Sequence, residues 1–258
     1  MSVLDSIIEG VREDLAARRL PLSQLHEQLS AAPTVIDAHS RLIAEEMNII
    51  AEVKRSSPSK GSLAAIGDPK ALAAKYEEAG AAVVSVLTER RRFGGSLADL
   101  VAVRSEIAIP ILRKDFMVDE YQFFEARAAG ADVVLLIVAA LSKNQLKDYH
   151  DLATELGMAV LVETHTRQEI DDAMAIEPRI IGVNARNLKT LEIDLAAFSE
   201  LIPTIPSSVI RIAESGISAR AEVEIAAQAG ANAILVGETL VKSGDPRSAI
   251  NHLLGRTS

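Results

Sequence analysis

The chain has 258 residues, of which 48% are hydrophobic and 24% are charged. This apolar content excludes an intrinsically disordered protein and is enough for a large buried core. The 27 lysine and arginine residues are outnumbered by 36 aspartate and glutamate residues, which gives a net charge of −9. A field of this sign repels polyanions, so we expect no nucleic-acid partner.

The composition also indicates where in the cell the protein is located and which catalytic groups it lacks. The longest apolar run, residues 133–141, is about half as long as the roughly 20 residues of a membrane-spanning helix, and the amino end lacks the apolar stretch of a signal peptide. We therefore expect a cytoplasmic protein with no membrane partner. The absence of cysteine excludes disulfides and thiolate chemistry, and five scattered histidines offer little for a metal site, so we expect no metal.

The amino-terminal part of the chain is predicted to be helical. Residues 3–20 and 22–31 show amphipathic helical patterns, and the second helix follows Pro21 with Ser23 as its expected cap. We assign residues 1–47 to a helical extension that packs on a catalytic domain formed by residues 48–258.

From residue 49 onward, short apolar runs alternate with amphipathic helical stretches. We predict strands at 49–53, 82–87, 109–112, 133–138, 159–162, 180–183, 209–213 and 233–236. The runs are continuously apolar, as in parallel strands covered on both faces. An Ala-Gly-Ala repeat precedes the second, fourth and eighth runs, with glycines at 80, 130 and 230 that suit left-handed helix ends.

Eight such units predict an α/β fold, a closed (β/α)8 TIM barrel, and the main alternative is an open doubly wound sheet. The open sheet usually carries a G-x-G-x-x-G turn after its first strand. Residues 54–61, which follow the first strand here, read K-R-S-S-P-S-K-G and lack that turn. We therefore favour the barrel.

Six of the eight predicted strands end in charged or amide residues, although buried parallel strands are expected to be apolar. These ends hold Glu52 and Lys54, Arg113 and Lys114, Glu163, Asn184 and Arg186, Glu214 and Ser215, and Gly237, Glu238 and Thr239. In a barrel the carboxyl ends meet at the face that carries the active site. Residues two apart on a strand point the same way, so Glu52 and Lys54 should share the barrel mouth.

Any one of these residues, Arg113 for example, is explained equally well by an ion pair that closes the barrel top. Such ion pairs do not explain the whole set equally well, because several acids and bases that converge on one concavity need mutual pairing or a ligand. Crowded charges also move the pKa values of lysines and carboxylates apart, which supplies an acid and a base near neutral pH.

Two glycine turns predict a phosphate site. Glu214-Ser215-Gly216 follows the seventh strand and Gly237-Glu238-Thr239 the eighth, and these loops commonly bind phosphate in such barrels. Amide N–H groups exposed at glycine hold a phosphate without a lysine. We expect a phosphorylated small-molecule substrate.

Other polar residues are expected to be solvated. We interpret His165 as a loop histidine, because no further histidine or cysteine is placed to form a metal site with it and Glu163. The arginine run at 90–92 is interpreted as a solvated loop, with the glycines at 94–95 as a hinge candidate.

Seven segments of the chain resemble the indole-3-glycerol-phosphate synthase family. They are IIAEVKRSSPSKG (49–61), ILRKDFMVDEYQ (111–122), ADVVLLIVAAL (131–141), LVETHT (161–166), IGVNARNLKTLEIDL (181–195), RIAESGI (211–217) and ILVGETLVKSGDP (234–246). The resemblance covers nearly the whole chain. It implies a carboxy-lyase of tryptophan biosynthesis that closes a ring in 1-(2-carboxyphenylamino)-1-deoxyribulose 5-phosphate, with loss of carbon dioxide and water and without a cofactor.

The resemblance also implies catalytic roles. Lys114 matches the general acid that protonates the substrate carbonyl, for which we expect a pKa lowered by neighbouring cations, and Glu163 matches the carboxylate that removes a proton during dehydration. Lys54 would contact anionic groups of the substrate and share acid duty, with Glu52 holding it in place. The sequence leaves open whether Lys54 or Lys114 donates the proton in each of the proton-transfer steps. Asn184 matches a residue that orients the substrate.

Further matches concern substrate binding. The family positions that hold the anthranilate part are Arg186, Ser57, Phe116, Leu135 and Leu188, and those of the floor and the phosphate site are Glu214, Ser215, Gly216, Gly237 and Thr239. Whether Glu238 or Thr239 contacts the phosphate stays open. Ala185 stands where many relatives have asparagine, with little effect expected because it should point away from the mouth.

Two other functions are weighed against this one. A Schiff-base aldolase would use a buried strand lysine, and a catalytically silent barrel would bind a phosphosugar without turnover. We favour the synthase because acid, base and anion site occur together. We expect a monomer, with weak homo-oligomerisation left open.

Overall fold

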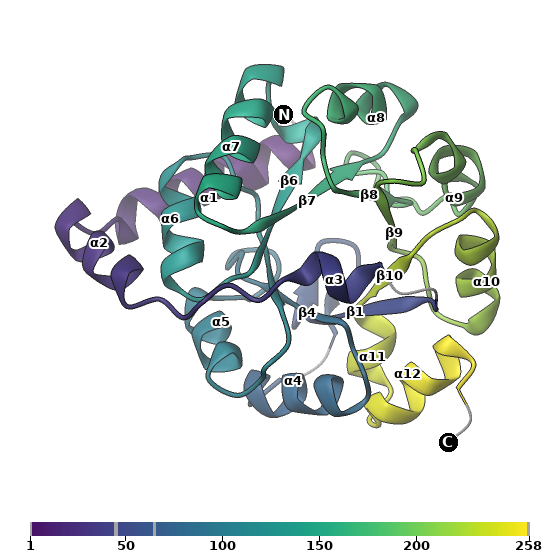
Figure 1. The fold of residues 1–258 in the computed structure, drawn as a ribbon. Coiled ribbons are helices and arrows are strands. Elements are labelled where there is room, and N and C mark those ends of the chain that lie inside the picture. The colour runs from purple at the N-terminus through teal and green to yellow at the C-terminus, as the bar shows by residue number, and fades with distance from the viewer. Residues whose placement is uncertain (1, 44–45, 64–65, 257–258) are drawn as a thin grey trace.

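The computed structural model describes residues 2–43, 46–63 and 66–256. Eight parallel strands close into a barrel in the order β1, β10, β9, β8, β7, β6, β5 and β4 (Figure 1). Their bounds are Asn48–Val53 (β1), Val83–Leu87 (β4), Ile111–Lys114 (β5), Val133–Ile137 (β6), Ala159–Thr164 (β7), Ile180–Asn184 (β8), Ile210–Glu214 (β9) and Ala233–Val236 (β10). The predicted (β/α)8 barrel is confirmed.

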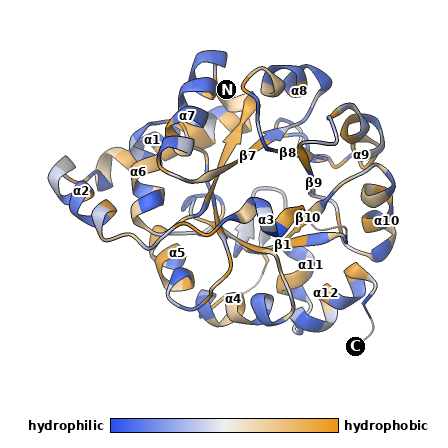
Figure 2. Ribbon diagram, viewed as in Figure 1, coloured by the Kyte–Doolittle hydropathy of each residue, from blue (hydrophilic) through white to orange (hydrophobic). Residues whose placement is uncertain are grey.

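Helices surround the barrel and follow its strands (Figure 1). They are α4 (Pro69–Glu78), α5 (Leu97–Arg104), α6 (Tyr121–Ala128), α7 (Lys143–Glu155), α8 (Arg167–Met174), α9 (Ala196–Leu201), α10 (Arg220–Gln228), α11 (Glu238–Lys242) and α12 (Pro246–Leu254), with 3₁₀ turns at Val138–Ala140 and Ile202–Thr204. Figure 2 shows hydrophobic residues on the strands and hydrophilic residues on the outer helices. The three repeat glycines, at 80, 130 and 230, end helices at φ values of 82°, 90° and 95°, as predicted.

The strand boundaries lie close to the predicted ones, with one shift. The third predicted strand, 109–112, is Ile111–Lys114 in the structure, because Pro110 has no N–H for the strand ladder. A short antiparallel hairpin of β2 (Ser56–Ser57) and β3 (Gly61–Ser62) follows β1 and was not predicted.

The extension contains α1 (Val3–Arg18), α2 (Leu22–Ser30) and the unpredicted α3 (Ala38–Leu42). Ser23 is not the cap of α2, which begins directly after Pro21 and has no side-chain cap. Leu4 of α1 packs at the carboxyl ends of the strands, and Leu42 of α3 packs at their amino ends. The two helices therefore close opposite ends of the barrel interior.

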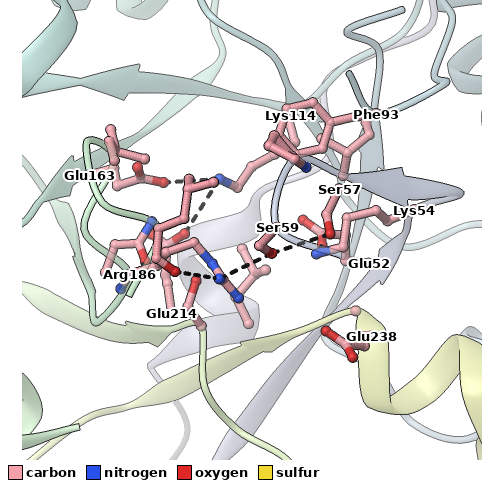
Figure 3. A pocket seen from close by; sticks show the side chains of 18 of the residues that line it. Glu52, Lys54, Ser57, Ser59, Phe93, Lys114, Glu163, Arg186, Glu214 and Glu238 are labelled. Atoms are coloured by element: carbon pink, nitrogen blue, oxygen red, sulfur yellow. Dashed lines mark hydrogen bonds and ion pairs between the residues drawn. The ribbon is translucent and has the colours of Figure 1, made fainter. Parts of the chain in front are cut away.

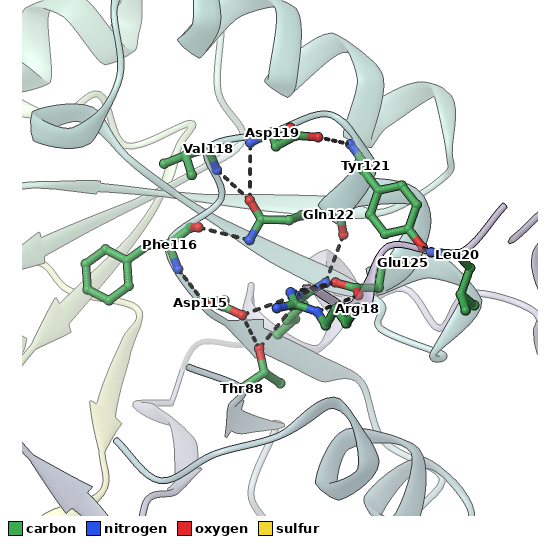
Figure 4. A network of polar contacts seen from close by, with 11 residues as sticks. Arg18, Leu20, Thr88, Asp115, Phe116, Val118, Asp119, Tyr121, Gln122 and Glu125 are labelled. Atoms are coloured by element: carbon green, nitrogen blue, oxygen red, sulfur yellow. Dashed lines mark hydrogen bonds and ion pairs between the residues drawn. The ribbon is translucent and has the colours of Figure 1, made fainter. Parts of the chain in front are cut away.

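Charged contacts fasten α1 to the barrel wall (Figure 4). Arg18 of α1 donates two hydrogen bonds to Glu125 of α6, at 2.8 and 3.0 Å. Glu125 also accepts from the guanidinium of Arg113 at 2.9 Å, and that guanidinium donates to Asp115 at 3.1 Å. Arg113 is fully buried outside the barrel wall, so this polar strand-end residue serves the fold.

The basic run at 90–92 is also part of this attachment. Arg91 pairs with Glu13 and Asp14 of α1, each at 2.7 Å. Gly95 lies so close to neighbouring backbone that an added Cβ would collide with a carbonyl oxygen. The three arginines of this run are exposed, as predicted for a solvated loop, and Arg91 uses its exposed position to pair with α1. The predicted hinge at 94–95 is disfavoured, because Gly95 is packed against the backbone of Leu87 and Thr88.

Candidate active site

The carboxyl ends of the strands surround a cavity of about 330 Å³ (Figure 3). Every residue predicted for the site lines it: Glu52, Lys54, Ser57, Lys114, Phe116, Leu135, Glu163, Asn184, Arg186, Leu188, Glu214, Ser215, Gly216, Gly237, Glu238 and Thr239. The structure thus brings the predicted residues together. Their individual roles stay predictions.

Strand alternation explains which side chains enter the cavity. Glu52 and Lys54 are two residues apart and both face the interior, as predicted, where they form an ion pair of 2.5 Å. Lys114 also faces inward, whereas its neighbour Arg113 faces the surrounding helices. Of these two adjacent cations of β5, Lys114 therefore belongs to the cavity and Arg113 to the contacts between the barrel wall and its helices.

Lys114 reaches two carboxyl groups from other strands (Figure 3). Its Nζ lies 2.9 Å from Oε2 of Glu163 on β7 and 3.6 Å from Oε2 of Glu214 on β9. Burial alone would lower the pKa of Lys114, but the charges of Glu163, Glu214 and Glu52 raise that pKa above its ordinary value. The predicted lowering of this pKa is therefore wrong, because the nearest charged groups are carboxylates.

Glu163 and Glu214 differ in charge although both are buried. Burial favours the neutral form of each, but the ammonium of Lys114 and the ring of His165 hold the pKa of Glu163 below its ordinary value. For Glu214, the charge of Glu163 adds to the effect of burial and raises the pKa to about 8. At neutral pH the site therefore holds an ionised carboxylate, a protonated carboxyl and a charged lysine.

Gly182 of β8 makes this arrangement possible and was missed in the sequence. It stands opposite Glu163 in the strand register, and an added Cβ would collide with Oε1 of Glu214. Glycine at this position leaves the space that the Glu214 side chain occupies inside the barrel. A glycine within a strand was the available signal, since it often marks a close approach.

The two predicted glycine turns lie at the edge of the cavity. Ser215 and Gly216 have φ values of 68° and 77°, in the left-handed region, which turns the chain sharply after β9. An added Cβ at Gly216 would lie 2.7 Å from Leu195, and one at Gly237 would collide with Glu52. The two turns are therefore tightly packed, the first against Leu195 and the second against Glu52.

The side chains beside these turns already have protein partners. The Glu238 carboxylate pairs with Lys60 and with Lys242, each at 2.8 Å. The Thr239 hydroxyl donates to the carbonyl of Ile217 at 2.9 Å. An anion bound here would therefore meet backbone N–H groups more readily than these two side chains.

A second part of the cavity is apolar. The rings of Phe93 and Phe116 lie with their centroids 6.2 Å apart at an angle of 41°, and Leu135 and Leu188 belong to the same cluster. Ile7 of α1 also lines the cavity. The contributions of α1 and Phe93 were missed, because an amphipathic pattern does not tell which surface a helix covers.

Arg186 brings a positive charge to this apolar part. Its Nη1 donates to the carbonyl of Leu191 at 3.0 Å and to the hydroxyl of Ser59 at 3.2 Å. Its backbone N–H donates to Oδ1 of Asn184 at 2.9 Å. An aromatic ring with an anionic substituent suits this combination of an apolar wall and a guanidinium.

His165 departs from its expected place. Its side chain is only 11% exposed and lies between Glu163 and Glu169, so the interpretation as a solvated loop residue is wrong. Within residues 2–43, 46–63 and 66–256, no group of three or more acidic or histidine side chains could hold a metal ion. None of the helices in the described part of the chain combines the length and hydropathy needed to cross a bilayer.

Proton transfer is the chemistry that this cavity supports, because a charged lysine touches an ionised carboxylate there. The fold and the position of the cavity are those of the (β/α)8 barrel class of enzymes, whose active sites lie at this face. A solved structure with the same fold, 3-hexulose-6-phosphate synthase from Salmonella typhimurium, gives a TM-score of 0.66 at 13% identity and covers 81% of this chain and 97% of that chain.

Sequence comparison gives the family. The model of the family described as indole-3-glycerol phosphate synthase matches residues 4–253. The protein of that name from Rhodococcus jostii (strain RHA1) is 55% identical over 256 residues, which are 98% of this chain and 95% of the relative. Its counterpart from Mycolicibacterium smegmatis is 54% identical over 98% of this chain and 94% of its own length. The chain belongs to the indole-3-glycerol phosphate synthase family, and the predicted class, a carboxy-lyase of tryptophan biosynthesis, is confirmed.

Proposed function

We propose that the cavity converts 1-(2-carboxyphenylamino)-1-deoxyribulose 5-phosphate to indole-3-glycerol phosphate by general acid–base catalysis. The observation that carries this proposal is the contact of 2.9 Å between Lys114 and Glu163, inside a cavity that also contains an apolar wall and two glycine turns. The wall suits the aromatic end of this substrate. The amides of Ser215, Gly216 and Gly237 suit its phosphate.

In the first step, the ring carbon that bears the carboxylate forms a bond to the ketone carbon, and the ketone oxygen takes a proton. Lys114 supplies this proton, since its ammonium is kept charged by Glu163 and Glu214. The same ammonium stabilises the negative charge that develops on the oxygen before the transfer is complete. Lys114 is neutral after this step.

Carbon dioxide then leaves, and the electrons of the broken bond restore the aromatic ring. Arg186, with Asn184 and Ser57 nearby, orients the carboxylate before it leaves. The apolar side chains of Phe116 and Leu135 favour the neutral product over the charged carboxylate.

Dehydration completes the indole ring. Glu163 takes a proton from the carbon beside the nitrogen, while the hydroxyl group leaves as water with a proton from Lys54, which Glu52 holds. Glu163 then returns its proton to the neutral Lys114. Two protons are donated and one is recovered, so Lys54 takes one proton from solvent in each turnover.

The raised pKa of Lys114 disfavours the alternative of a Schiff-base aldolase, because a charged ammonium is not a nucleophile. We place the reaction in the cytosol, with other biosynthetic enzymes, and we retain the expectation of a monomer.

The assay that tests the function needs only protein and substrate. We expect indole absorbance to rise when purified protein is mixed with 1-(2-carboxyphenylamino)-1-deoxyribulose 5-phosphate, with no added metal or nucleotide. A metal chelator should leave the rate unchanged. Folded protein that produces no indole absorbance would contradict the proposed function.

Gly182→Ala tests the packing of the site. We expect kcat/KM to fall about a hundredfold, because the new methyl group displaces Glu214 and with it the contacts of Lys114. Steady-state kinetics measure the loss, and circular dichroism checks the fold. Gly67→Ala is the control, since an added Cβ there meets nothing within 4 Å. Equal activity of the two variants would show that Glu214 does not need this space.

A further inference from the structure

His165, directly after β7, connects the buried base to a second carboxylate. Its Nε2 lies 3.5 Å from Oε1 of Glu163, and its Nδ1 lies 3.1 Å from Oε2 of Glu169 on α8. The same Glu169 oxygen accepts from the backbone N–H of His165 at 2.7 Å. The imidazole is therefore fixed by Glu169 and points its other nitrogen at Glu163.

The environment of the ring favours its charged form. The charged groups that face it are Glu163 on β7, Glu169 on α8 and Lys114 on β5. Burial alone would lower the pKa of His165, but the two carboxylates raise that pKa above its ordinary value. Nε2 is buried without a hydrogen-bond partner, and the Glu163 carboxylate lies 3.5 Å from it. Its N–H is thus available to Glu163.

The proposed function explains why Glu163 needs a positively charged neighbour in addition to Lys114. Lys114 becomes neutral in the first step, yet Glu163 must stay ionised until dehydration. Without a positive charge nearby, the buried Glu163 would take the proton that Glu214 carries, and the base would be lost. The imidazolium of His165 is the cation that remains next to Glu163 during this interval.

We propose that His165, held by Glu169, is a positioning residue that keeps Glu163 ionised and oriented after Lys114 has protonated the substrate. The role rests on the proposed ring-closure mechanism and adds to it a line of charged contacts from Glu169 through His165 to Glu163. His165 itself neither touches the substrate nor gives up its proton.

His165→Gln tests this role, since glutamine keeps a hydrogen-bonding group and removes the charge. We expect kcat to fall about tenfold at neutral pH, less than the roughly 10²–10⁴-fold effect of losing a general base itself, while KM changes less than about twofold. The acid limb of the kcat–pH profile should move to higher pH, because Glu163 loses a cation that lowers its pKa. The loss should therefore be largest at low pH and shrink as the pH rises.

Two further variants make the result decisive. Glu169→Gln keeps an acceptor for the His165 backbone N–H but removes the carboxylate that favours the imidazolium, so the acid limb should shift in the same direction. It serves as the main test should His165→Gln fail to fold. His150→Gln is the matched control, because that histidine is similarly buried, at 15% exposure, and lies on α7 outside the cavity. Its kinetics should equal those of the unaltered protein.

An NMR titration of the His165 ring gives a readout that needs no turnover. We expect a pKa above the ordinary histidine value in the unaltered protein and a lower pKa in Glu169→Gln. A His165 pKa below the ordinary value, an unshifted acid limb in both variants, or a rise in KM with unchanged kcat would each overturn the inference. Absence of turnover in the unaltered protein would instead contradict the proposed function, and the titration would still decide the charge of His165.

Discussion

Lys114→Met should lower kcat by about a thousandfold, within the range expected for loss of a general acid. Methionine has a similar length but carries no proton, so the ketone oxygen of the substrate loses both its proton source and the charge that stabilises it. The base is affected as well. With the ammonium gone from its position 2.9 Å from Glu163, the pKa of that carboxyl rises and Glu163 becomes protonated more readily.

Single-turnover formation of indole absorbance measures this effect without interference from product release. Lys143→Met is the control, because Lys143 is an exposed residue of α7 that pairs with Asp172 at the surface. It should retain full activity. A Lys114→Met variant that reacts within about tenfold of the control rate would show that another group, Lys54 for example, is the first acid.

Arg113→Met should lower the free energy of unfolding by about 3–5 kcal/mol, the usual cost of removing one partner from a buried ion pair. The guanidinium donates to Asp115 at 3.1 Å, to Glu125 at 2.9 Å and to the carbonyl of Gln122 at 2.9 Å. Its removal leaves these acceptors with fewer donors in a site where the arginine side chain is 0% exposed. It also weakens the attachment of α1 through Glu125.

Urea denaturation of this variant measures the change in unfolding free energy. Arg247→Met is the control, because Arg247 forms an exposed ion pair of 3.6 Å with Glu78, and such pairs contribute about 0–1 kcal/mol. A loss below about 1 kcal/mol for Arg113→Met would contradict its role as the buried charge centre of this network. Together, the Lys114→Met and Arg113→Met experiments distinguish the roles of two adjacent residues of β5: we expect Lys114 to act in the reaction and Arg113 to stabilise the fold.

The fold and the polar strand-end residues of the site were predictable because both follow from short-range patterns, whereas Ser57, Phe116, Leu135 and Leu188 were expected there only from the family resemblance. Continuously apolar runs locate strands, and the carboxyl ends of parallel strands must meet at one face, so Glu52, Lys114 and Glu163 could be placed together before any distance was known. The alternation of side chains along a strand also put Glu52 and Lys54 on the same face. These inferences need no knowledge of how the helices pack.

The charge states were not predictable, because they depend on distances between strands. Lys114 was expected among cations, but it sits between two carboxyl groups that come from β7 and β9. The burial of His165 depends on the start of α8, where Glu169 turns back toward its ring. The position of α1 over the mouth involves contacts between segments far apart in the sequence, among them the packing of Leu4 and Ile7 in the barrel cluster and the ion pair of Arg91 with Asp14.

A crystal structure with bound indole-3-glycerol phosphate would test most directly whether one cavity holds both the phosphate and the reacting ring. We predict the phosphate within hydrogen-bond distance of the backbone N–H groups of Gly216 and Gly237, and the indole ring against Phe116 with Lys114 and Glu163 at its five-membered side. A product molecule bound with its phosphate at the outer arginines of residues 90–92, or with its ring away from Lys114, would contradict this account.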